Sequence, residues 1–281
     1  MIGKPVTVSA IMPTYNAAPY LAAAIESIRQ QTYTDWELII IDDGSTDATP
    51  AILAQYRDPR IITERIEANQ GRGVARNMAL QRCRGRYIAI CDSDDMSLPG
   101  RFARQVEVLT QRPDIDVVSG QVAYFWGDEP PETRLLYPED PAVIQARFAR
   151  GRMAVSHAAA MIRATCFQRF GLYATECHRA QDLEFFLRIR HACSFMTLPD
   201  RLVLYRHERR IPFTKWLENA WYTRYAAYHA AAGRAGSHAT ILTFQQFSQL
   251  WATRLRVYTI DILRFLNFQL RTYIGTQRIL R

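Results

Sequence analysis

Three carboxylates fall within four residues, directly after an apolar segment of the chain. Asp92, Asp94 and Asp95 belong to the run CDSDD, which follows the apolar residues 87–90. Carboxylates this close repel one another and resist ionising together unless a cation lies between them. Mg²⁺ and Mn²⁺ prefer such oxygen ligands and commonly bind one or two carboxylates together with substrate phosphates. The cluster favours a divalent metal that holds a diphosphate, and the alternative is a solvated acidic turn that caps the next helix.

Two other apolar segments also end in polar turns. Residues 36–41 run into an acidic turn that contains Asp43 and Asp47, and Thr46 or Asp47 can cap a following helix. The apolar residues 6–12 run into four residues that offer polar or aromatic contacts: Pro13, Thr14, Tyr15 and Asn16. In a parallel sheet these turns share one edge, which is where open α/β sheets bind their ligands.

The elements that must position these turns alternate in the first part of the chain. Apolar runs predict strands over 6–12, 36–41, 60–64 and 87–90, and helical spacing predicts helices from 21, over 51–56, over 73–83 and after Pro99. This alternation predicts an α/β fold, with a mostly parallel sheet flanked by helices on both faces. Farther on, the pattern predicts strands over 117–126 and 158–162, helices over 143–149 and around 183–189, and an entirely helical segment over 213–281 with a loop near 232–236.

Composition narrows the class of protein. The chain is 48% hydrophobic and 22% charged, as expected of a globular protein. Its five cysteines contain no Cys-x-x-Cys pair, which indicates reduced thiols in a cytoplasmic protein without a zinc site. We expect no signal peptide, because the N-terminal residues lead straight into a strand without a charged and then apolar segment. We expect no membrane span, because no apolar run reaches ~20 residues. No nucleic-acid partner is expected.

Basic residues are concentrated at the C-terminal end. From Arg201 onward the chain holds 13 Lys+Arg against 3 Asp+Glu, whereas the first 200 residues are slightly acidic. Bulky apolar side chains share that segment, including Trp251, Tyr258 and Phe265. Arg-rich helices of this type can lie in the headgroup region of an anionic membrane. The alternatives are a helical cap on the catalytic domain and a homodimer surface.

Known phosphate-binding motifs are absent. No Gly-x-Gly-x-x-Gly follows the first expected strand, and the chain has no Walker-type loop. The glycine-containing residues 69–73 instead lead into a helix that carries Arg76. A helix start of this kind can bind an anion, and Arg76 can pair with Asp43 or with a ligand. A plain glycine loop and a structural ion pair are the alternatives.

Four runs, taken in order, resemble the family 2 glycosyltransferases of the GT-A fold. They are VSAIMPTYNAAPYLAAAIESIRQQTYTDWELIIIDDGSTD, NQGRGVARNMAL, GRYIAICDSDDMSLPGRFARQ and AQDLEFFLRI, and the resemblance covers roughly residues 5–207. It implies a nucleoside diphosphate sugar as substrate, often linked to UDP, and Mn²⁺ or Mg²⁺ as cofactor. Pro13, Thr14, Tyr15 and Asn16 would line the nucleoside pocket, with Asp43 accepting from the base and Arg76 nearby. In the Asp-x-Asp motif, Asp94 would ligate the metal directly, and Asp92 with Ser93 would lie near the ribose or a metal-bound water. Asp95 would cap the following helix.

The same resemblance places the catalytic base in the second half of the glycosyltransferase domain. Where relatives carry an acidic pair, this chain has Gln181 and Asp182, so Asp182 is the expected base and Glu184 a weaker alternative. One base suffices for an inverting transfer, because only the acceptor hydroxyl must lose a proton. His157 falls where relatives often carry polar residues facing the acceptor, although a lone histidine there is more often structural. His207, in a YRxH-like segment, would contact the diphosphate.

These expectations give a domain scheme and a function. Residues 1–210 would form the glycosyltransferase domain, with a nucleotide-sugar half to about 120 and an acceptor half over 121–210, and residues 211–281 a helical extension. The enzyme would transfer a sugar, with inversion and with a metal, to a glycan or lipid-linked acceptor in bacterial surface polysaccharide or glycoconjugate synthesis. It would act in the cytoplasm or peripherally at the inner membrane face. A sugar nucleotidyltransferase and a non-catalytic binding module are the alternatives, and Gln181 is the feature that favours the latter.

Overall fold

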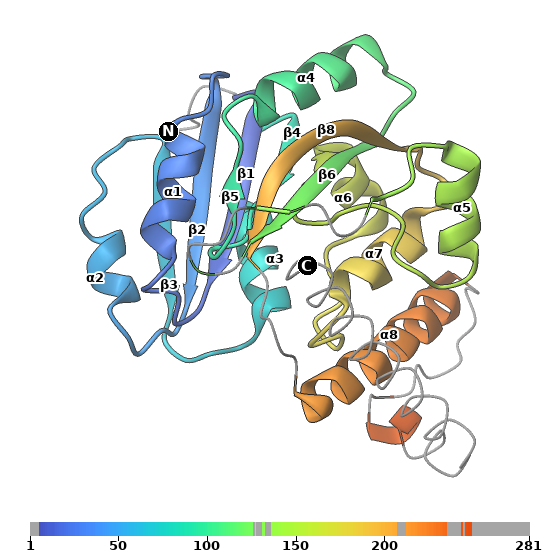
Figure 1. Cartoon of the computed structure of the whole chain (residues 1–281). Helices are drawn as coiled ribbons and strands as arrows, with labels where there is room; N and C mark the ends of the chain where they lie inside the picture. The colour runs from blue at the N-terminus through green and yellow to red at the C-terminus, as the bar shows by residue number, and fades with distance from the viewer. Residues whose placement is uncertain are drawn as a thin grey trace, which may run out of the picture.

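A computed structural model describes residues 6–125, 127, 131–132, 136–206, 212–234, 243 and 245–248. Figure 1 shows the arrangement of the elements, several of which gather around a central sheet. Their order is β1 (Val8–Thr14), α1 (Leu21–Arg29), β2 (Trp36–Asp43), α2 (Thr49–Leu53), β3 (Ile61–Ile66), α3 (Arg72–Arg82), β4 (Tyr87–Ile90), β5 (Met96–Ser97), α4 (Arg101–Gln111), β6 (Val117–Phe125), α5 (Pro141–Ala149), β7 (Met161–Arg163), α6 (Ala164–Phe170), α7 (Gln181–Ile189), β8 (Phe195–Arg206) and α8 (Phe213–Arg234).

The described strands form one sheet, in the order β3-β2-β1-β4-β7-β6-β8-β5. β1 pairs in parallel with β2 and β4, and β2 pairs in parallel with β3. β7 is antiparallel to both of its neighbours, whereas β8 is parallel to β6 and antiparallel to the short β5. The predicted α/β fold with a mostly parallel sheet is therefore confirmed.

Helices cover both faces of the sheet, because its strands are apolar on both sides. In β1, Ala10 and Met12 join a core that includes Leu21 of α1 and Phe102 of α4. The residue between them, Ile11, joins a second core with α3, α5, α6 and α7. Alternate residues of one strand thus anchor two helical layers.

The polar turns after β1, β2 and β4 lie at one edge of the sheet, as expected, since these strands are parallel neighbours. Gly44, in the turn after β2, has a φ of +74°. A Cβ atom there would lie 2.7 Å from the backbone nitrogen of Asn69. Glycine is therefore required for the turn after β2 to approach the loop before α3.

The spacing of apolar residues predicts the strands and helices less accurately after residue 114. The expected strand over 158–162 is wrong in its bounds, since β7 covers Met161–Arg163 and residues 157–160 form a turn. β8, β5 and α6 were not predicted. The expected loop near 232–236 begins too early, because α8 continues to Arg234.

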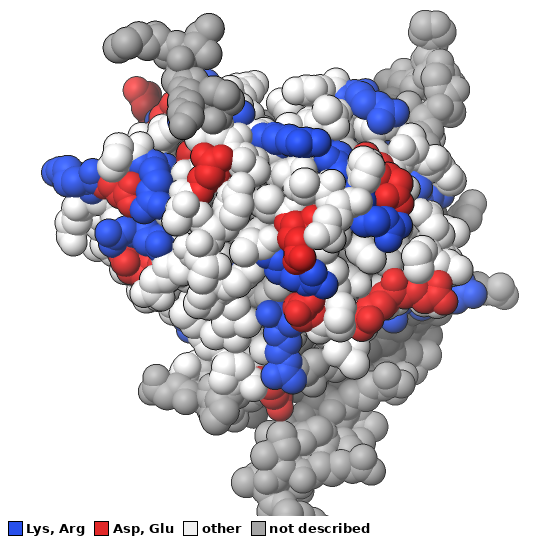
Figure 2. Space-filling view, turned by 90° about the horizontal axis from the view of Figure 1, so that it is seen from above, with Lys and Arg blue, Asp and Glu red and all other residues white. Residues whose placement is uncertain are grey.

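Only part of the expected helical extension lies within the described residues. α8 packs against α7, and Phe247 is buried against Tyr225 and Tyr228 of α8. Residues 249–281, and with them most of the basic tail, lie outside the described residues. No helix in the described part of the chain is long and apolar enough to cross a membrane. In Figure 2, acidic and basic side chains are interspersed over the face of the molecule that is shown.

Candidate active site

The turn after β2 is fixed to the start of α3 by Asp43. Its Oδ1 accepts a hydrogen bond from the backbone N–H of Gln70, and its Oδ2 accepts one from that of Gly71, both at 2.8 Å. The side chain is buried. Asp43 therefore shapes the loop that leads into α3, and its contact with a nucleotide base stays a prediction.

The four predicted residues at the end of β1 and directly after it divide into two roles. Asn16 shapes the turn: its φ is +49°, and its Oδ1 accepts from the backbone N–H of Thr46 at 2.8 Å. Pro13 and Thr14 are buried, and the hydroxyl of Thr14 has no hydrogen-bond partner among the described residues. Tyr15 is 48% exposed. An exposed aromatic ring beside a free buried hydroxyl can contact a flat polar ligand such as a nucleoside.

Arg76 pairs with the first carboxylate of the acidic run. Its Nη2 lies 2.7 Å from Oδ1 of Asp92, and both side chains are largely buried. The expected alternative of an Arg76–Asp43 pair is wrong, because Arg76 pairs with Asp92 and the Asp43 carboxylate accepts from backbone amides in the loop before α3. Burial of Asp92 opposes its ionisation, but the charges of Arg76 and Arg72 outweigh it and lower its pKa to about 2.

The other acidic residues of this turn lie in different surroundings. Asp94 is exposed, and its pKa is raised by partial desolvation and by the charge of Asp92. Ser93 is half-buried between them. Asp95 is buried and accepts from the backbone N–H of Arg206 at 2.8 Å. The expectation that Asp95 caps the next helix is wrong, since α4 begins only at Arg101 and has no side-chain cap.

Two arginines near the acidic turn were not predicted. Arg72 is the first residue of α3, and the charges of Asp92 and Asp94 raise its pKa, against a smaller effect of burial. Its spacing of four from Arg76 places both on one face of the helix, which is a signal that the sequence offered. Arg206 donates from Nε to the carbonyl of Asp94 at 3.1 Å. Its guanidinium lies over the rings of Tyr20 and Phe125, 4.1 and 4.4 Å from their centroids.

Asp182 lies in the first turn of α7, and its negative charge acts on Arg72. The expected base and the acidic turn therefore belong to one electrostatic environment. The cap position is Ala180, whose φ is +57°, so Asp182 is not the capping residue. Its Oδ1 accepts from the adjacent Leu183 N–H at 2.9 Å. Its Oδ2 has no hydrogen-bond partner among the described residues and can receive a proton.

The neighbours of Asp182 are unsuited to act as the base. Glu184 is fully buried, with Oε1 3.0 Å from Nε of Arg188 and 3.3 Å from Nδ1 of His229. The expectation of Glu184 as an alternative base is therefore wrong. Burial opposes its ionisation, but hydrogen bonds from His229 and Arg188 prevail and lower its pKa. Gln181 is buried, and its Nε2 has no hydrogen-bond partner among the described residues.

His157 is buried, and its surroundings favour the neutral imidazole. Its Nε2 is 2.9 Å from Oη of Tyr173, and its ring packs against Phe186. Burial and the charge of Arg76 lower its pKa to about 4, against the opposing charge of Asp182. This environment agrees with the structural role that the sequence favoured. His207 lies outside the described residues.

Comparison with known proteins identifies the family. Residues 9–170 match the model of glycosyl transferase family 2. An uncharacterized glycosyltransferase of Methanocaldococcus jannaschii is 34% identical over 210 residues, which are 72% of this chain and 71% of that protein. The chain belongs to glycosyl transferase family 2.

Other curated relatives match mainly over shorter segments. A putative teichuronic acid biosynthesis glycosyltransferase of Bacillus subtilis, TuaG, is 45% identical over 107 residues, covering 37% of this chain and 42% of the relative. The UDP-Glc:alpha-D-GlcNAc-diphosphoundecaprenol beta-1,3-glucosyltransferase WfgD of Escherichia coli is 40% identical over 102 residues. These residues cover 36% of this chain and 40% of the relative. The chain thus spans less than half the length of these two family 2 relatives.

Solved structures support the GT-A fold. S. aureus TarS in complex with UDP-GlcNAc has a TM-score of 0.64 at 19% identity, covering 86% of this chain and 70% of that chain. The mannosyltransferase PcManGT from Pyrobaculum calidifontis, in complex with GDP-Man and Mn²⁺, has a TM-score of 0.60 at 18% identity. The match covers 96% of this chain and 86% of that chain. At these identities the likeness shows the fold of this family 2 protein.

The acidic turn of this family 2 protein has the ligand chemistry that a divalent metal requires. Arg76 engages only Oδ1 of Asp92, and the Asp94 carboxylate makes no hydrogen bond to another described residue. Oxygen atoms of two neighbouring carboxylates are therefore available, and burial together with repulsion from Asp92 raises the pKa of Asp94. A hard cation would relieve that repulsion, so Asp92 and Asp94 fit Mn²⁺ or Mg²⁺.

Proposed function

We propose that this protein transfers a sugar from a nucleoside diphosphate sugar to a hydroxyl group of a glycan or lipid-linked acceptor, with inversion at the anomeric carbon. UDP is the nucleotide we expect, and bacterial surface polysaccharide or glycoconjugate synthesis is the expected setting. Family membership supports the reaction class. The chemistry of the site supports the roles of individual residues.

One observation carries the proposal: Arg76, which pairs with Asp92, lies over the Tyr173 ring at 5.8 Å, and that ring packs against Phe185 of α7. These contacts bring the acidic turn after β4 close to α7, whose first turn holds Asp182, although the two belong to different parts of the chain. Transfer from a diphosphate sugar requires this arrangement. It needs cations beside the leaving diphosphate and a base beside the attacking hydroxyl.

The reaction would proceed as a single displacement. Oδ2 of Asp182 accepts the proton of the acceptor hydroxyl as its oxygen bonds to the anomeric carbon. The bond from that carbon to the diphosphate oxygen breaks, and the opposite face of the sugar is attacked, which inverts the configuration. The positive charge of Arg72 stabilises the leaving diphosphate. A metal ion held by Asp92 and Asp94, when bound, would neutralise further phosphate charge.

The two substrates would contact different parts of the chain. We assign the sugar nucleotide to residues 1–120, with Pro13, Thr14 and Tyr15 at the nucleoside, Ser93 near the ribose and His207 at the diphosphate. Residues 121–210 would bind the acceptor, and residues 211–281 would form a helical extension. A lipid-linked acceptor agrees with the diphosphoundecaprenol substrate in the name of the Escherichia coli relative.

A hydrolysis and binding screen tests the proposal. The protein is incubated with UDP-, GDP- and dTDP-sugars, with Mn²⁺ and after chelation, and release of the nucleoside diphosphate is followed. We expect one nucleotide series to be hydrolysed slowly, only with metal, and the same nucleotide to raise the melting temperature. Formation of a nucleotide sugar from a nucleoside triphosphate and a sugar phosphate would instead show a nucleotidyltransferase. Binding without turnover, even with acceptor glycolipids, would show a non-catalytic module.

A further inference from the structure

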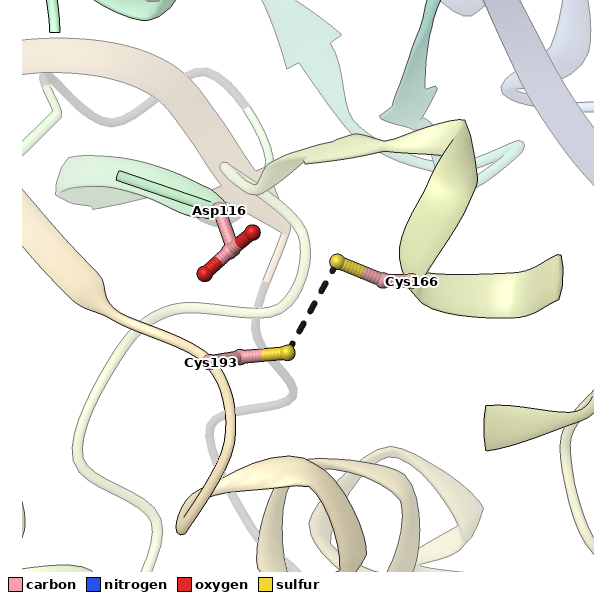
Figure 3. A group of neighbouring side chains, drawn as sticks. All are labelled: Asp116, Cys166 and Cys193. Atoms are coloured by element: carbon pink, nitrogen blue, oxygen red, sulfur yellow. Dashed lines mark hydrogen bonds between the residues drawn. The ribbon is translucent and has the colours of Figure 1, made fainter. Parts of the chain in front are cut away.

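A second cluster of metal-binding side chains lies outside the candidate active site. Figure 3 shows Asp116, Cys166 and Cys193 pointing toward one another. The two sulfur atoms are 3.8 Å apart, and one ligand atom from each residue lies within 4.8 Å of the others. Asp116 precedes β6, Cys166 lies in α6, and Cys193 lies between α7 and β8. Three segments that are distant in sequence therefore meet at this point.

The two cysteines of the cluster are buried, Asp116 is half-buried, and its carboxylate is held in place. Cys166 is 1% exposed and Cys193 is 5% exposed. Oδ2 of Asp116 accepts from the backbone N–H of Ser194 at 2.9 Å, and the backbone N–H of Asp116 donates to the carbonyl of Ser194 at 3.0 Å. A hydrogen bond to one oxygen of a ligating carboxylate is a common support for a metal site, and it leaves Oδ1 available.

The distance between the sulfur atoms matches a tetrahedral metal site. Two thiolates at about 2.3 Å from Zn²⁺, separated by a tetrahedral angle, lie about 3.8 Å apart. Cysteine thiolates and a carboxylate are also ligand types that Zn²⁺ accepts. We propose that Asp116, Cys166 and Cys193 bind one Zn²⁺ ion, with a water molecule at the fourth position. On binding, the metal displaces the thiol protons of Cys166 and Cys193 into solvent.

This site is separate from the acidic turn. β6 runs in the same direction as β4, because both are antiparallel to β7. The pairing places Ile88 of β4 level with Val117 of β6 through their shared partner, Ile162. Asp92 lies beyond Ile88 toward one edge of the sheet, and Asp116 lies before Val117 toward the other. Five residues of strand separate the two levels, or about 16 Å at ~3.3 Å per residue.

The zinc ion would therefore stabilise the acceptor half and take no part in sugar transfer. It would join the start of β6, the first turn of α6 and the loop before β8. β6 and β8 bring Phe125 and Arg206 to the acidic turn at the strand ends opposite the zinc site, so loss of the ion is expected to lower the melting temperature before it lowers turnover.

Metal titration of the full chain tests this proposal. The reduced protein is treated with chelator and titrated with Zn²⁺, and with Co²⁺ as a spectroscopic probe of thiolate coordination. We expect a single equivalent of tightly bound Zn²⁺, a rise in melting temperature, and a thiolate-to-cobalt charge-transfer band. The band should survive in Asp94→Ala, which separates this site from the acidic turn. Cys166→Ser, Cys193→Ser and Asp116→Asn should each weaken Zn²⁺ binding by at least about 10-fold.

Two controls decide the result. Cys83→Ser, outside the cluster, should bind Zn²⁺ as the wild type does, and circular dichroism of each variant checks folding. Asp116→Asn keeps both thiols and the size of the side chain, so it remains informative if a cysteine variant unfolds. Equal Zn²⁺ affinity in the wild type and all three variants would overturn the proposal. It would also be overturned if peroxide formed a Cys166–Cys193 disulfide while the reduced protein bound no metal.

Discussion

At the scale of single residues, Arg72 carries much of the positive charge that the candidate site offers to a ligand. Arg76 forms an ion pair with Asp92. Arg72 is exposed, and the negative charges of Asp92, Asp94 and Asp182 raise its pKa. A diphosphate that entered this space would meet the Arg72 guanidinium, which can bind two phosphate oxygens at once.

We expect Arg72→Gln to raise the KM for the sugar nucleotide about 10-fold and to lower kcat as well, because the leaving diphosphate loses a cation. Steady-state kinetics over a range of substrate concentrations measures both. Arg82→Gln is the matched control, since Arg82 lies on the same helix in a surface pair with Glu64. Equal effects of the two substitutions would show that Arg72 has no specific role.

Asp94→Ala tests the metal assignment. The side chain is exposed and makes no hydrogen bond to another described residue, so the fold should be retained. We expect binding of UDP in the presence of Mn²⁺ to weaken by about 10-fold or more, with little change in the absence of metal. Calorimetry with and without Mn²⁺ measures this, and Asp114→Ala, at the surface, is the control. Wild-type affinity of Asp94→Ala at limiting Mn²⁺ would remove Asp94 from the metal site.

The sequence located the candidate site residues whose position depends on their neighbours in sequence, and their chemical roles stay predictions. The acidic run could be recognised because it follows a clearly apolar strand, and Asp182 because it lies at the start of a clearly amphipathic helix. The partners of Arg76, Asp95 and Glu184 could not, since Asp92, Arg206 and His229 reach them from other elements. Pairing of this kind depends on the packed fold.

At the scale of elements, α7 and α8 are joined through a buried charge cluster. Glu184 pairs with Arg188 and His229, and Arg188 also donates to the backbone carbonyls of Phe170 and Leu172. Because Asp182 lies in the first turn of α7, this cluster holds the helix that presents the proposed base.

Glu184→Gln should lower the free energy of unfolding by about 2 kcal/mol, because it leaves the Arg188 charge without its buried partner. Chemical denaturation measures this, with Glu64→Gln as a surface control that should change stability by less than about 1 kcal/mol. The pKa of Glu184 is lowered in the folded state, so its contribution is present above pH 4.5 and is lost as pH falls through the lower value. The difference between wild type and Glu184→Gln should therefore shrink in acid. A constant difference down to pH 2 would contradict this.

Strand β8 shows why part of the fold was not predictable. Its alternating pattern is interrupted by exposed residues 199–201, and its register with β6 shifts around Gly120 and Gln121. The sequence of such an irregular strand resembles that of a loop, because it lacks the regular alternation of apolar and polar residues. In contrast, β1, β2 and β4 are fully buried and mostly apolar, and α1 and α4 have clear apolar faces, so their predicted types are confirmed.

At the scale of the whole molecule, the uneven charge favours membrane contact through the C-terminal segment. From residue 240 onward the chain has six arginines against Asp261 alone. Each basic residue near an anionic leaflet contributes ~1 kcal/mol, and salt screens this attraction. The mixed charges in Figure 2 show no comparable surplus on that face of the described residues.

We therefore expect the full chain to sediment with anionic vesicles at low salt and to be partly released at high salt. Removal of residues 240–281 should abolish sedimentation while hydrolysis of the sugar nucleotide remains measurable. Equal binding to neutral vesicles would exclude the electrostatic explanation. If neither vesicle binds, the tail is better explained as a packing cap or a homodimer surface, which the contact of Phe247 with α8 also allows.

The central claim is that Asp182 is the base of a sugar transfer, and Asp182→Asn tests it most directly. Asparagine keeps the size and the hydrogen bond to Leu183 but cannot accept the proton. Sugar transfer and UDP affinity are measured on the same preparation, with Asp114→Asn as the surface control. We predict that transfer falls by ~10²- to 10⁴-fold while UDP affinity changes by less than about 3-fold. Transfer at the wild-type rate, or a loss of UDP affinity large enough to explain the loss of turnover, would contradict the account.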